Sequence, residues 1–379
     1  MSTIAISPAD RPSRRTESPL RIGMIAPPWF ALPPEGYGGT EAVVASLVDQ
    51  LVELGHEVTL VAAGAPGTRA TRHITTYAEP PTDQLGSSPM PEVIHVAEAA
   101  EAIEGLDLDL VHDHSLAGPL LARGRDIPTL ATMHGPSLGE NGDYFTRLGR
   151  TIDLVSISHA QREDAPHLNW VGTVYNAIDL SSFPFREAKE RDVLWLGRFS
   201  PDKGAHVAIE AARRAGRRII LAGKLNETAE QEYFDSEVRP LLGSDAEYVG
   251  EADAELKREL YAKSSCLVFP ISWDEPFGMV MVEAMACGTP VVATRRGSVP
   301  EVIDDGRTGI IVDDFDDLPA AIARADALDP HECRARVAAH FDLPVMGAGY
   351  ERIYRRVLER WSTTATFRQA AASRTARTA

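Results

Sequence analysis

The hydrophobic positions of this chain alternate between short apolar runs and longer amphipathic stretches. Runs such as 21–26 and 57–63 are typical of buried strands, whereas residues 40–54 repeat apolar side chains at helical spacing. Gly55 follows this stretch and favours a helix end there. A strand, a glycine loop, a helix and a second strand in this order form one βαβ unit of a parallel sheet. We therefore expect an α/β protein.

The same alternation continues along most of the chain and predicts two sets of strands. The first set is expected at 21–26, 57–63, 72–79, 108–113, 128–133, 153–157 and 171–175. The second set is expected at 192–197, 217–222, 246–249, 266–271, 290–293 and 309–312. Helices are predicted between them at 40–54, 92–104, 116–124, 203–215, 230–242, 253–263, 278–287, 299–304 and 315–325.

The segment 176–191 separates the two sets of strands and carries Pro184 and several charges, so we expect a domain boundary there. A chain of 379 residues also suits two cores better than one. Further helices are expected at 330–339 and 344–361. The predicted organisation is a disordered terminus at 1–19, a Rossmann-like domain at 20–180, a second one at 185–343, a final helix at 344–361 and a disordered tail at 362–379.

The composition is that of a globular protein. No apolar run approaches the roughly 20 residues that cross a bilayer, and the three cysteines show no paired spacing. The net charge of −17 disfavours binding to nucleic acid or to anionic lipid surfaces. We find no Lys/Arg-rich amphipathic helix that would bind a membrane. These features favour a cytoplasmic protein without stable membrane association.

The predicted helix 278–287 is apolar or small throughout except for Glu283. Such a helix is buried, and a buried carboxylate is costly unless it is paired or hydrogen-bonded. Two interpretations remain open: Glu283 either completes a core network with a distant Arg, or accepts hydrogen bonds from ligand hydroxyls in a cleft. Glu275, in the preceding loop, would face the same cleft. An anion site would be formed by the first-turn amides of Phe277, Gly278 and Met279.

The stretch 275–291 resembles the signature of the retaining glycosyltransferases of family 4. That signature places two glutamates in the context Glu-Pro-Phe-Gly…Glu-Ala-Met-Ala-x-Gly-x-Pro-Val, which this chain matches at nearly every position. The resemblance implies the GT-B architecture, with two Rossmann-like domains facing each other across a cleft and a last helix that crosses back to the first domain. It also implies that Glu275 contacts the donor sugar and that Glu283 contacts the nucleotide ribose.

The loop 36–41, Gly-Tyr-Gly-Gly-Thr-Glu, follows the first predicted strand. Glycines at this place let backbone amides approach a phosphate, although a flexible turn is an equally good local interpretation. Because Glu41 stands where the dinucleotide fingerprint needs glycine, a nicotinamide cofactor is disfavoured. The resemblance implies that Gly38 and Gly39 face the donor diphosphate. The Gly-Gly-Thr-Glu form resembles a subset of antibiotic-modifying and other small-molecule glycosyltransferases, with Glu41 as an acceptor contact.

Arg198 ends a predicted strand and Lys203 begins the next helix, so both cations can converge at one sheet edge. Fixed cations there would stabilise a departing pyrophosphate, which is the role of a metal in other enzymes. A solvated surface pair is the alternative, but the family's Gly-Arg…Lys-Gly pattern favours the catalytic role. The Asp-x-Asp sequences at 107–109 and 314–316 lie in expected turns. We therefore expect no metal.

Histidines stand at the ends of two neighbouring predicted strands. A lone histidine is more often structural, but the resemblance implies that His134 contacts the donor sugar. His112 and His114 suggest a metal site, yet no third ligand is in view. We predict instead that Asp113 and His114 contact the acceptor. The glycine-rich segment 135–144 is expected to be a loop of the acceptor pocket.

The motifs and the resemblance together predict a retaining, metal-independent glycosyltransferase. It would move a hexose from a nucleotide-diphosphate sugar, with UDP-glucose as the first expectation, to the hydroxyl of a soluble small-molecule or saccharide acceptor. No cofactor is expected, since the nucleotide sugar is a substrate. The alternatives are a non-catalytic protein that binds sugar nucleotides or glycans, and a sugar-nucleotide epimerase on the same fold.

Overall fold

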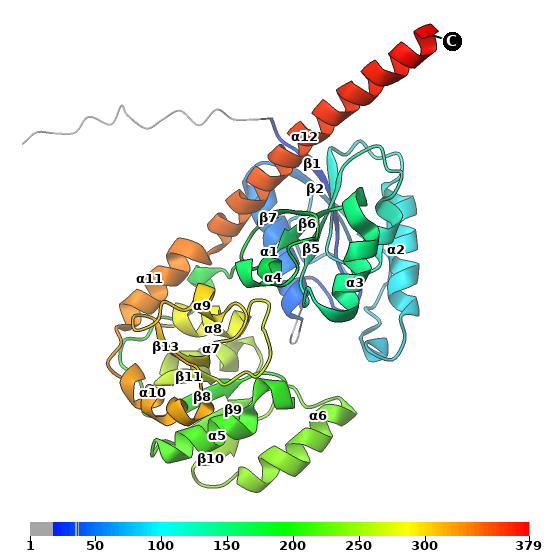
Figure 1. Cartoon of the computed structure of the whole chain (residues 1–379). Coiled ribbons are helices and arrows are strands. Elements are labelled where there is room, and N and C mark those ends of the chain that lie inside the picture. Colours follow the sequence, from blue (N-terminus) through cyan, green and yellow to red (C-terminus); the bar gives the residue numbers. More distant parts are fainter. Residues whose placement is uncertain (1–17, 35, 37, 379) are drawn as a thin grey trace, which may run out of the picture.

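The computed structural model of this protein describes residues 18–34, 36 and 38–378. Its strands form two sheets in two lobes (Figure 1). The first sheet contains β1 Arg21–Ile25, β2 Glu57–Ala62, β3 Arg72–Thr75, β4 Leu110–Asp113, β5 Thr129–Met133, β6 Asp153–Ser156 and β7 Trp170–Thr173. The second contains β8 Val193–Leu196, β9 Ile219–Ala222, β10 Ala246–Tyr248, β11 Cys266–Phe269, β12 Val291–Thr294 and β13 Gly309–Val312.

Helices connect these strands and cover the sheets. Those of the first lobe are α1 Gly39–Glu53, α2 Met90–Ile103, α3 Gly139–Leu148 and α4 His159–Asp164. Those that follow are α5 Ala205–Arg214, α6 Thr228–Tyr233, α7 Ala254–Lys263, α8 Met279–Ala286, α9 Val299–Val302, α10 Leu318–Ala325, α11 Pro330–His340 and α12 Leu343–Thr378. The predicted α/β class is confirmed.

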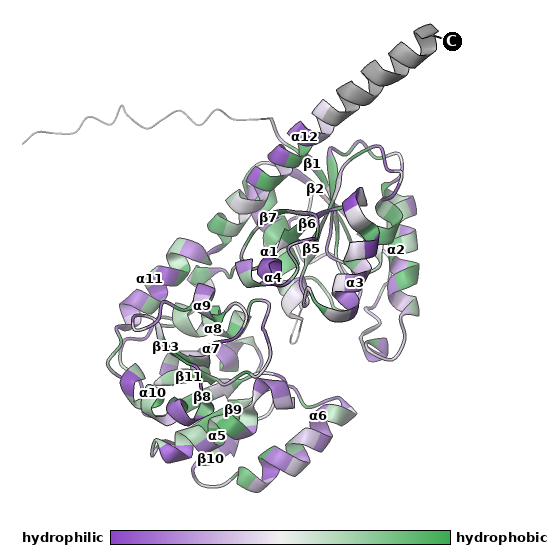
Figure 2. Cartoon of the chain, in the orientation of Figure 1, coloured by the Kyte–Doolittle hydropathy of each residue, from purple (hydrophilic) through white to green (hydrophobic). Residues whose placement is uncertain are grey.

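Both sheets are parallel, with the strand orders β3-β2-β1-β4-β5-β6-β7 and β10-β9-β8-β11-β12-β13. Parallel strands are joined by crossover helices, which bury both faces of the sheet. Every residue of β4, β5 and β11 is accordingly buried, and the strands inside both lobes are mostly hydrophobic (Figure 2). The short apolar runs of the sequence therefore marked the strands reliably.

Two segments between the strands of the first lobe differ from prediction. The helix expected at 116–124 is only a 3-10 turn, Gly118–Ala122, because Pro119 supplies no backbone N–H and Gly118 packs tightly against Asp113. The loop expected at 135–144 gives way to α3 from Gly139 onward. The glycines of this segment favour a loop in the sequence. Phe145 and Leu148 are buried and lie three positions apart, a spacing that is typical of a helix.

Two later segments also differ. The helix predicted at 230–242 divides into α6, a π-helical turn at Phe234–Val238 and a 3-10 turn at Arg239–Leu241. The last helix does not end at 361, since α12 continues to Thr378 through the tail that was expected to be disordered. The predicted disorder at 1–17 lies outside the described residues.

The final helix joins the two lobes. It starts beside the second lobe and runs along the first, where it packs on α1 and β7 (Figure 1). Buried side chains recur on one face of α12 every three or four residues: Met346, Tyr350, Ile353, Tyr354 and Val357. They share one hydrophobic core with α1, β1 and β2. The second lobe is thus held to the first by its own C-terminal helix.

Glu301 of α9 forms a second link between the lobes. Its two carboxylate oxygens accept hydrogen bonds from the backbone N–H groups of His159 and Ala160, each at 2.7 Å. Tyr175 donates its hydroxyl to the same carboxylate at 2.9 Å. These N–H groups open α4 and lack helical partners, so Glu301 caps a helix of the opposite lobe. The cap fixes how the two lobes face each other.

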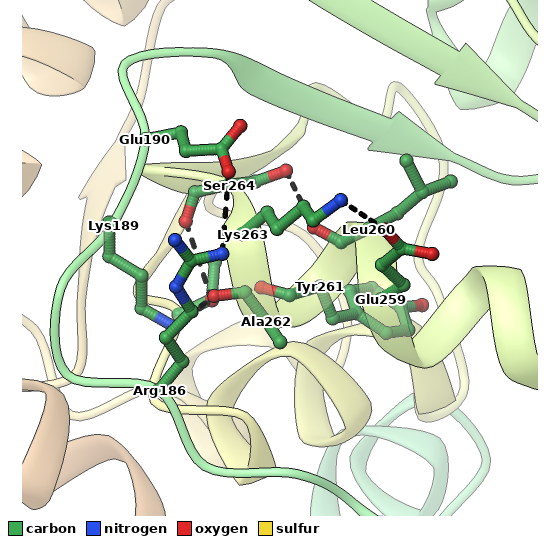
Figure 3. Close-up of polar contacts among 10 residues, drawn as sticks. Arg186, Lys189, Glu190, Glu259, Leu260, Tyr261, Ala262, Lys263 and Ser264 are labelled. Atoms are coloured by element: carbon green, nitrogen blue, oxygen red, sulfur yellow. Dashed lines mark hydrogen bonds and ion pairs between the residues drawn. The ribbon is translucent and has the colours of Figure 1, made fainter.

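Figure 3 shows the linker residue Lys189 beside Ala262, near the end of α7. The ammonium of Lys189 anchors the linker between the lobes, because it donates to three acceptors at helix ends in the second lobe. These are the carbonyls of Ala262 and Cys287, at 3.0 and 2.8 Å, and the hydroxyl of Thr289 at 2.8 Å. We expect Lys189→Met to lower the free energy of unfolding by about 1–3 kcal/mol, because it removes three hydrogen bonds to buried residues. Urea denaturation measures this loss.

The matched control is Lys263→Met, since Lys263 is exposed and pairs only with Glu259 on the same helix among the described residues. Its effect is expected to stay within about 0.5 kcal/mol. Equal unfolding free energies for the two variants would show that the linker anchor contributes nothing.

Candidate active site

A cavity of about 460 Å³ lies between the lobes, at the carboxyl ends of strands from both sheets. Ligands bind at this edge of parallel sheets, where the strand order reverses. The reversals lie between β1 and β4 and between β8 and β11. The volume falls within the range of ligand pockets, about 300–1,000 Å³. The predicted site residues that line it are Gly38, Gly39, His134, Arg198, Lys203, Glu275, Phe277, Gly278, Met279 and Glu283.

Lys203 and Glu275 line this cavity and form an ion pair with each other. The two side chains are only 16% and 12% exposed, so the pair is largely withdrawn from water. The ammonium of Lys203 also lies 4.8 Å from the ring centre of Trp273, at cation–π distance. A carboxylate therefore holds Lys203 in place, while other N–H groups of the ammonium can bind an anion.

Arg198 lines the same cavity from the loop after β8 and is exposed. Its guanidinium adds a second positive charge to the side that carries Lys203. Sequence had placed these two cations at one sheet edge, and the structure brings both to the cavity. Two cations in one cleft attract an anion more strongly than isolated surface charges do.

Glu283 is 8% exposed and has two partners on α7. Its Oε1 accepts from Lys257 Nζ at 2.7 Å, and its Oε2 accepts from the Tyr261 hydroxyl at 2.9 Å. Glu283 is therefore paired within its lobe and also lines the cavity, while its contact with ligand hydroxyls stays a prediction. Its partner is a lysine and not the arginine considered from sequence. Lys257 lines the cavity as well.

The glycine loop opens α1 on the other side of the cavity. Gly38 has a φ of +144°, and an added Cβ would lie 2.9 Å from Pro34 Cβ, so a larger residue is disfavoured there. Gly39 begins the helix and has no neighbour near its missing side chain. Among the described residues, the first intrahelical bond is from Ala42 N to Gly38 O. The preceding amides are thus available to an anion.

A second helix start faces the cavity at α8. Gly278 has a φ of +79°, and the helix begins at Met279. The ring of Phe277 is not available to a ligand, because it packs against Tyr175 and Phe341 in the core, with ring centres 6.1 and 5.8 Å away. Any contact of Phe277 with a ligand in the cavity would therefore use its backbone.

His134 lines the cavity, where it is partly exposed, and it lies in a row with the buried side chains of His114 and His112. His114 Nδ1 lies 2.9 Å from His134 Nε2, and the rings of His112 and His114 are 4.0 Å apart. Burial lowers the pKa of His134 to about 4, and burial together with the neighbouring His134 lowers the pKa of His112 to about 3. All three rings are therefore neutral near pH 7. His134 can contact a ligand as an uncharged donor or acceptor.

Both ring nitrogens of His112 are already engaged. Nδ1 lies 2.7 Å from the Tyr354 hydroxyl, and Nε2 lies 2.8 Å from Thr132 Oγ1. Tyr350 extends the network to Thr132 at 3.0 Å. Helix α12 thus fixes the orientation of the His112 ring through the hydroxyls of Tyr354 and Tyr350. Within the described residues no group of His, Cys, Asp and Glu is arranged to hold a metal ion.

The three residues predicted to contact an acceptor do not line the cavity. Glu41 is 4% exposed in the first turn of α1, and burial raises its pKa to about 7. Asp113 accepts from the Ser115 amide and hydroxyl at 2.9 and 2.6 Å, which shapes the turn after β4. His114 stands behind His134. The cavity lining gives no support to acceptor contacts from these three side chains.

Sequence reasoning missed several side chains of the cavity, notably Trp273, Lys257 and Lys224. Lys257 and Tyr261 lie four positions apart on α7, so a shared helix face was a usable signal. Trp273 stands just before the acidic residues Asp274 and Glu275, but a lone tryptophan carries no signal of its own. Lys224 follows β9 and pairs with Glu227 at 2.8 Å.

Two family models match this chain in succession. Residues 37–182 match Glycosyltransferase Family 4, and residues 179–338 match Glycosyl transferases group 1. The two matches meet in the linker between the lobes and together span most of the chain. Within the described residues no helix is long and apolar enough to cross a membrane.

Individual relatives agree with the family models. A phosphatidyl-myo-inositol mannosyltransferase of Mycolicibacterium smegmatis is 26% identical and covers 89% of this chain and 94% of its own. The crystal structure of AviGT4, a glycosyltransferase involved in avilamycin A biosynthesis, is 28% identical with a TM-score of 0.70, covering 90% of this chain and 98% of its own.

HepE from Anabaena, solved with UDP-glucose, shares the fold at 19% identity and a TM-score of 0.66, covering 91% of this chain and all of its own. The sheets, the facing glycine and glutamate motifs, and these matches agree on one assignment. The chain belongs to the family 4 glycosyltransferases of the GT-B fold and is a glycosyltransferase.

Proposed function

We propose that this glycosyltransferase transfers a hexose from a nucleotide-diphosphate sugar to an acceptor hydroxyl, with retention of configuration and without a metal ion. The observation that carries the proposal is the shared cavity. Two cations, Arg198 and Lys203, face the helix-start amides of Gly38 and Gly39 across it, and Glu275 and Glu283 line the same space. This combination suits a ligand with a diphosphate and two sugar rings.

The diphosphate would lie between the amides of the glycine loop and the two cations. Negative charge grows on its leaving oxygen as the bond to the anomeric carbon breaks, and fixed positive charge lowers the energy of that state. The acceptor oxygen attacks from the same face, and an oxygen of the departing phosphate takes its proton. No protein nucleophile is required by this route. Glu275 would hold hydroxyls of the transferred sugar.

UDP-glucose is the proposed first choice of donor. HepE, which shares the fold, is solved with UDP-glucose, and Glu283 with its partner Lys257 offers a charged clamp suited to ribose hydroxyls. We propose a soluble acceptor and a cytoplasmic location. The three cysteines are buried free thiols, which agrees with a reducing compartment.

The test is a transfer assay with EDTA present and with UDP-, GDP- and ADP-sugars as donors. We expect release of the nucleotide from one donor at a rate that EDTA does not change. Proton NMR of the product should show the anomeric configuration of the donor retained. Loss of turnover with EDTA, or an inverted product, would overturn the proposed mechanism. Binding without any turnover would identify a non-catalytic sugar-nucleotide-binding protein.

Glu283→Ala is expected to weaken nucleotide binding by about 10- to 100-fold, because it removes the proposed ribose contact and leaves Lys257 unpaired. The expected change in kcat at saturating donor is small. Isothermal titration with UDP measures the affinity. Glu251→Ala is a useful comparison, because Glu251 lines the same cavity without a predicted ribose contact. Equal affinities in the two variants would contradict the assignment of Glu283.

A further inference from the structure

A second cavity of about 150 Å³ lies beside the first and is lined by both lobes. Trp273, Glu275 and Pro276 line both cavities, so the two share one wall. Ser137 and Asp164 reach the second cavity from the first lobe. A group bound in it would therefore lie next to the side chain that is proposed to hold the transferred sugar.

Two polar groups of this second cavity have no hydrogen-bond partner among the described residues. The hydroxyl of Ser137 is buried and unpaired, and the whole residue is only 2% exposed. The indole N–H of Trp273 is also buried and unpaired. Leaving buried polar groups without partners costs about 1–3 kcal/mol each. A ligand with hydroxyl groups would satisfy both.

The second cavity is also acidic. Asp164 ends α4 in the first lobe, and Asp274 precedes Glu275 in the second, so the two carboxylates approach from opposite sides. Burial, and then the negative charges of Asp274 and Glu163, raise the pKa of Asp164. Asp274 is exposed and accepts a hydrogen bond from the Gly297 amide at 3.2 Å. No described residue that lines the cavity is basic.

On the premise of the transferase function above, we propose that the second cavity is the acceptor subsite and that it selects a polyhydroxylated acceptor carrying an ammonium group. Asp164 and Asp274 would bind the ammonium from either side. Ser137 and Trp273 would bind hydroxyls. The acceptor oxygen then forms its bond to the anomeric carbon as the bond to the diphosphate breaks, and its proton passes to the diphosphate.

Matched sugars that differ in one group test this proposal. Glucosamine, glucose and N-acetylglucosamine are titrated calorimetrically into the full-length protein in the presence of excess UDP, and each is also assayed for transfer. We expect glucosamine to bind about tenfold tighter than either neutral sugar, because two carboxylates face its ammonium. The preference should shrink at high salt.

The double variant Asp164→Asn/Asp274→Asn keeps the shape of the cavity and removes both charges. We expect this variant to bind all three sugars with similar affinity, because only its affinity for glucosamine falls. Asp83→Asn, an exposed aspartate of the first lobe, is the matched control and should keep the preference. Equal binding of the sugars by the wild type, or a preference that survives in the double variant, would overturn the acceptor proposal.

The binding measurement tests the acceptor subsite separately from the proposed transfer reaction. If sugar transfer occurs but no ammonium preference is found, only the acceptor proposal fails. If the preference is found without turnover of any donor, the site is supported and the proposed reaction fails.

Discussion

Replacing Glu275 with alanine is expected to lower the rate of sugar transfer by about 10³-fold and to leave UDP affinity within about threefold of the wild type. Glu275 lines both cavities, and its carboxylate holds the ammonium of Lys203. Removing it takes away the proposed contact with the transferred sugar and releases the cation that faces the diphosphate. Single-turnover assays at saturating donor measure the chemical step directly.

Two variants separate this effect from simple loss of folding. Glu275→Gln keeps the shape of the side chain but not its charge, so it should retain UDP binding and lose most of the transfer rate. Glu259→Ala removes an exposed glutamate that pairs with Lys263 on α7 and should behave as the wild type. A Glu275→Ala enzyme with wild-type turnover would refute the site. Thermal unfolding of each variant shows whether the fold persists.

Acid is expected to destabilise this protein through its row of three histidines. Burial holds the pKa of His112 near 3 and that of His134 near 4, and it holds the pKa of His114 well below the ordinary value. In the unfolded chain the value is about 6.5. The unfolded state therefore binds more protons below pH 6.5, so each histidine costs about 1.4 kcal/mol of stability per pH unit as the pH falls toward its folded pKa.

Two buried carboxyls oppose this trend. Burial raises the pKa of Asp113 to about 6 and that of Glu41 to about 7, so both take up protons in the folded state before the unfolded chain does. Between about pH 6 and pH 4.5, the stability gained from these two carboxyls offsets the stability lost through two of the three histidines. The net expectation from these five groups is a loss of about 1.4 kcal/mol per pH unit over that window.

His112→Gln isolates one histidine from the other titrating groups, which are the same in both proteins. Urea denaturation between pH 7 and pH 4.5 should give a slope of stability against pH that is shallower than the wild-type slope by about 1.4 kcal/mol per pH unit. Glutamine can still bond to Tyr354 or Thr132, which limits the damage to the network. His331→Gln, at an exposed position, is the matched control for replacing a histidine by glutamine. Parallel slopes for His112→Gln and the wild type would contradict the argument.

Local pattern was enough to place most of the strands and the edge at which the site forms. The carboxyl ends of parallel strands meet at one edge whatever the helices between them look like, so Arg198 and Glu275 of the second sheet are expected to lie near each other. That Gly39 of the first sheet faces them is implied only by the family resemblance. The hydrophobic pattern predicted the wrong element in two segments that contain glycine or proline. The pattern predicts a loop where a helix starts at Gly139, and it predicts a helix where a 3-10 turn forms around Pro119.

The α/β class, the strand ends that carry the motifs and the identity of the charged groups follow from the amino-acid order alone, since they depend on neighbours along the chain. Only the tertiary structure decided the partners: Lys203 with Glu275, Lys257 with Glu283, and α12 behind His112. It also left Glu41 outside the cavity and opened a second, acidic one. The two ion pairs depend on how the helices and loops of the second lobe pack, and the cavities depend on how α12 and Glu301 hold the two lobes together. Residues so distant in the chain leave no periodic trace of their pairing.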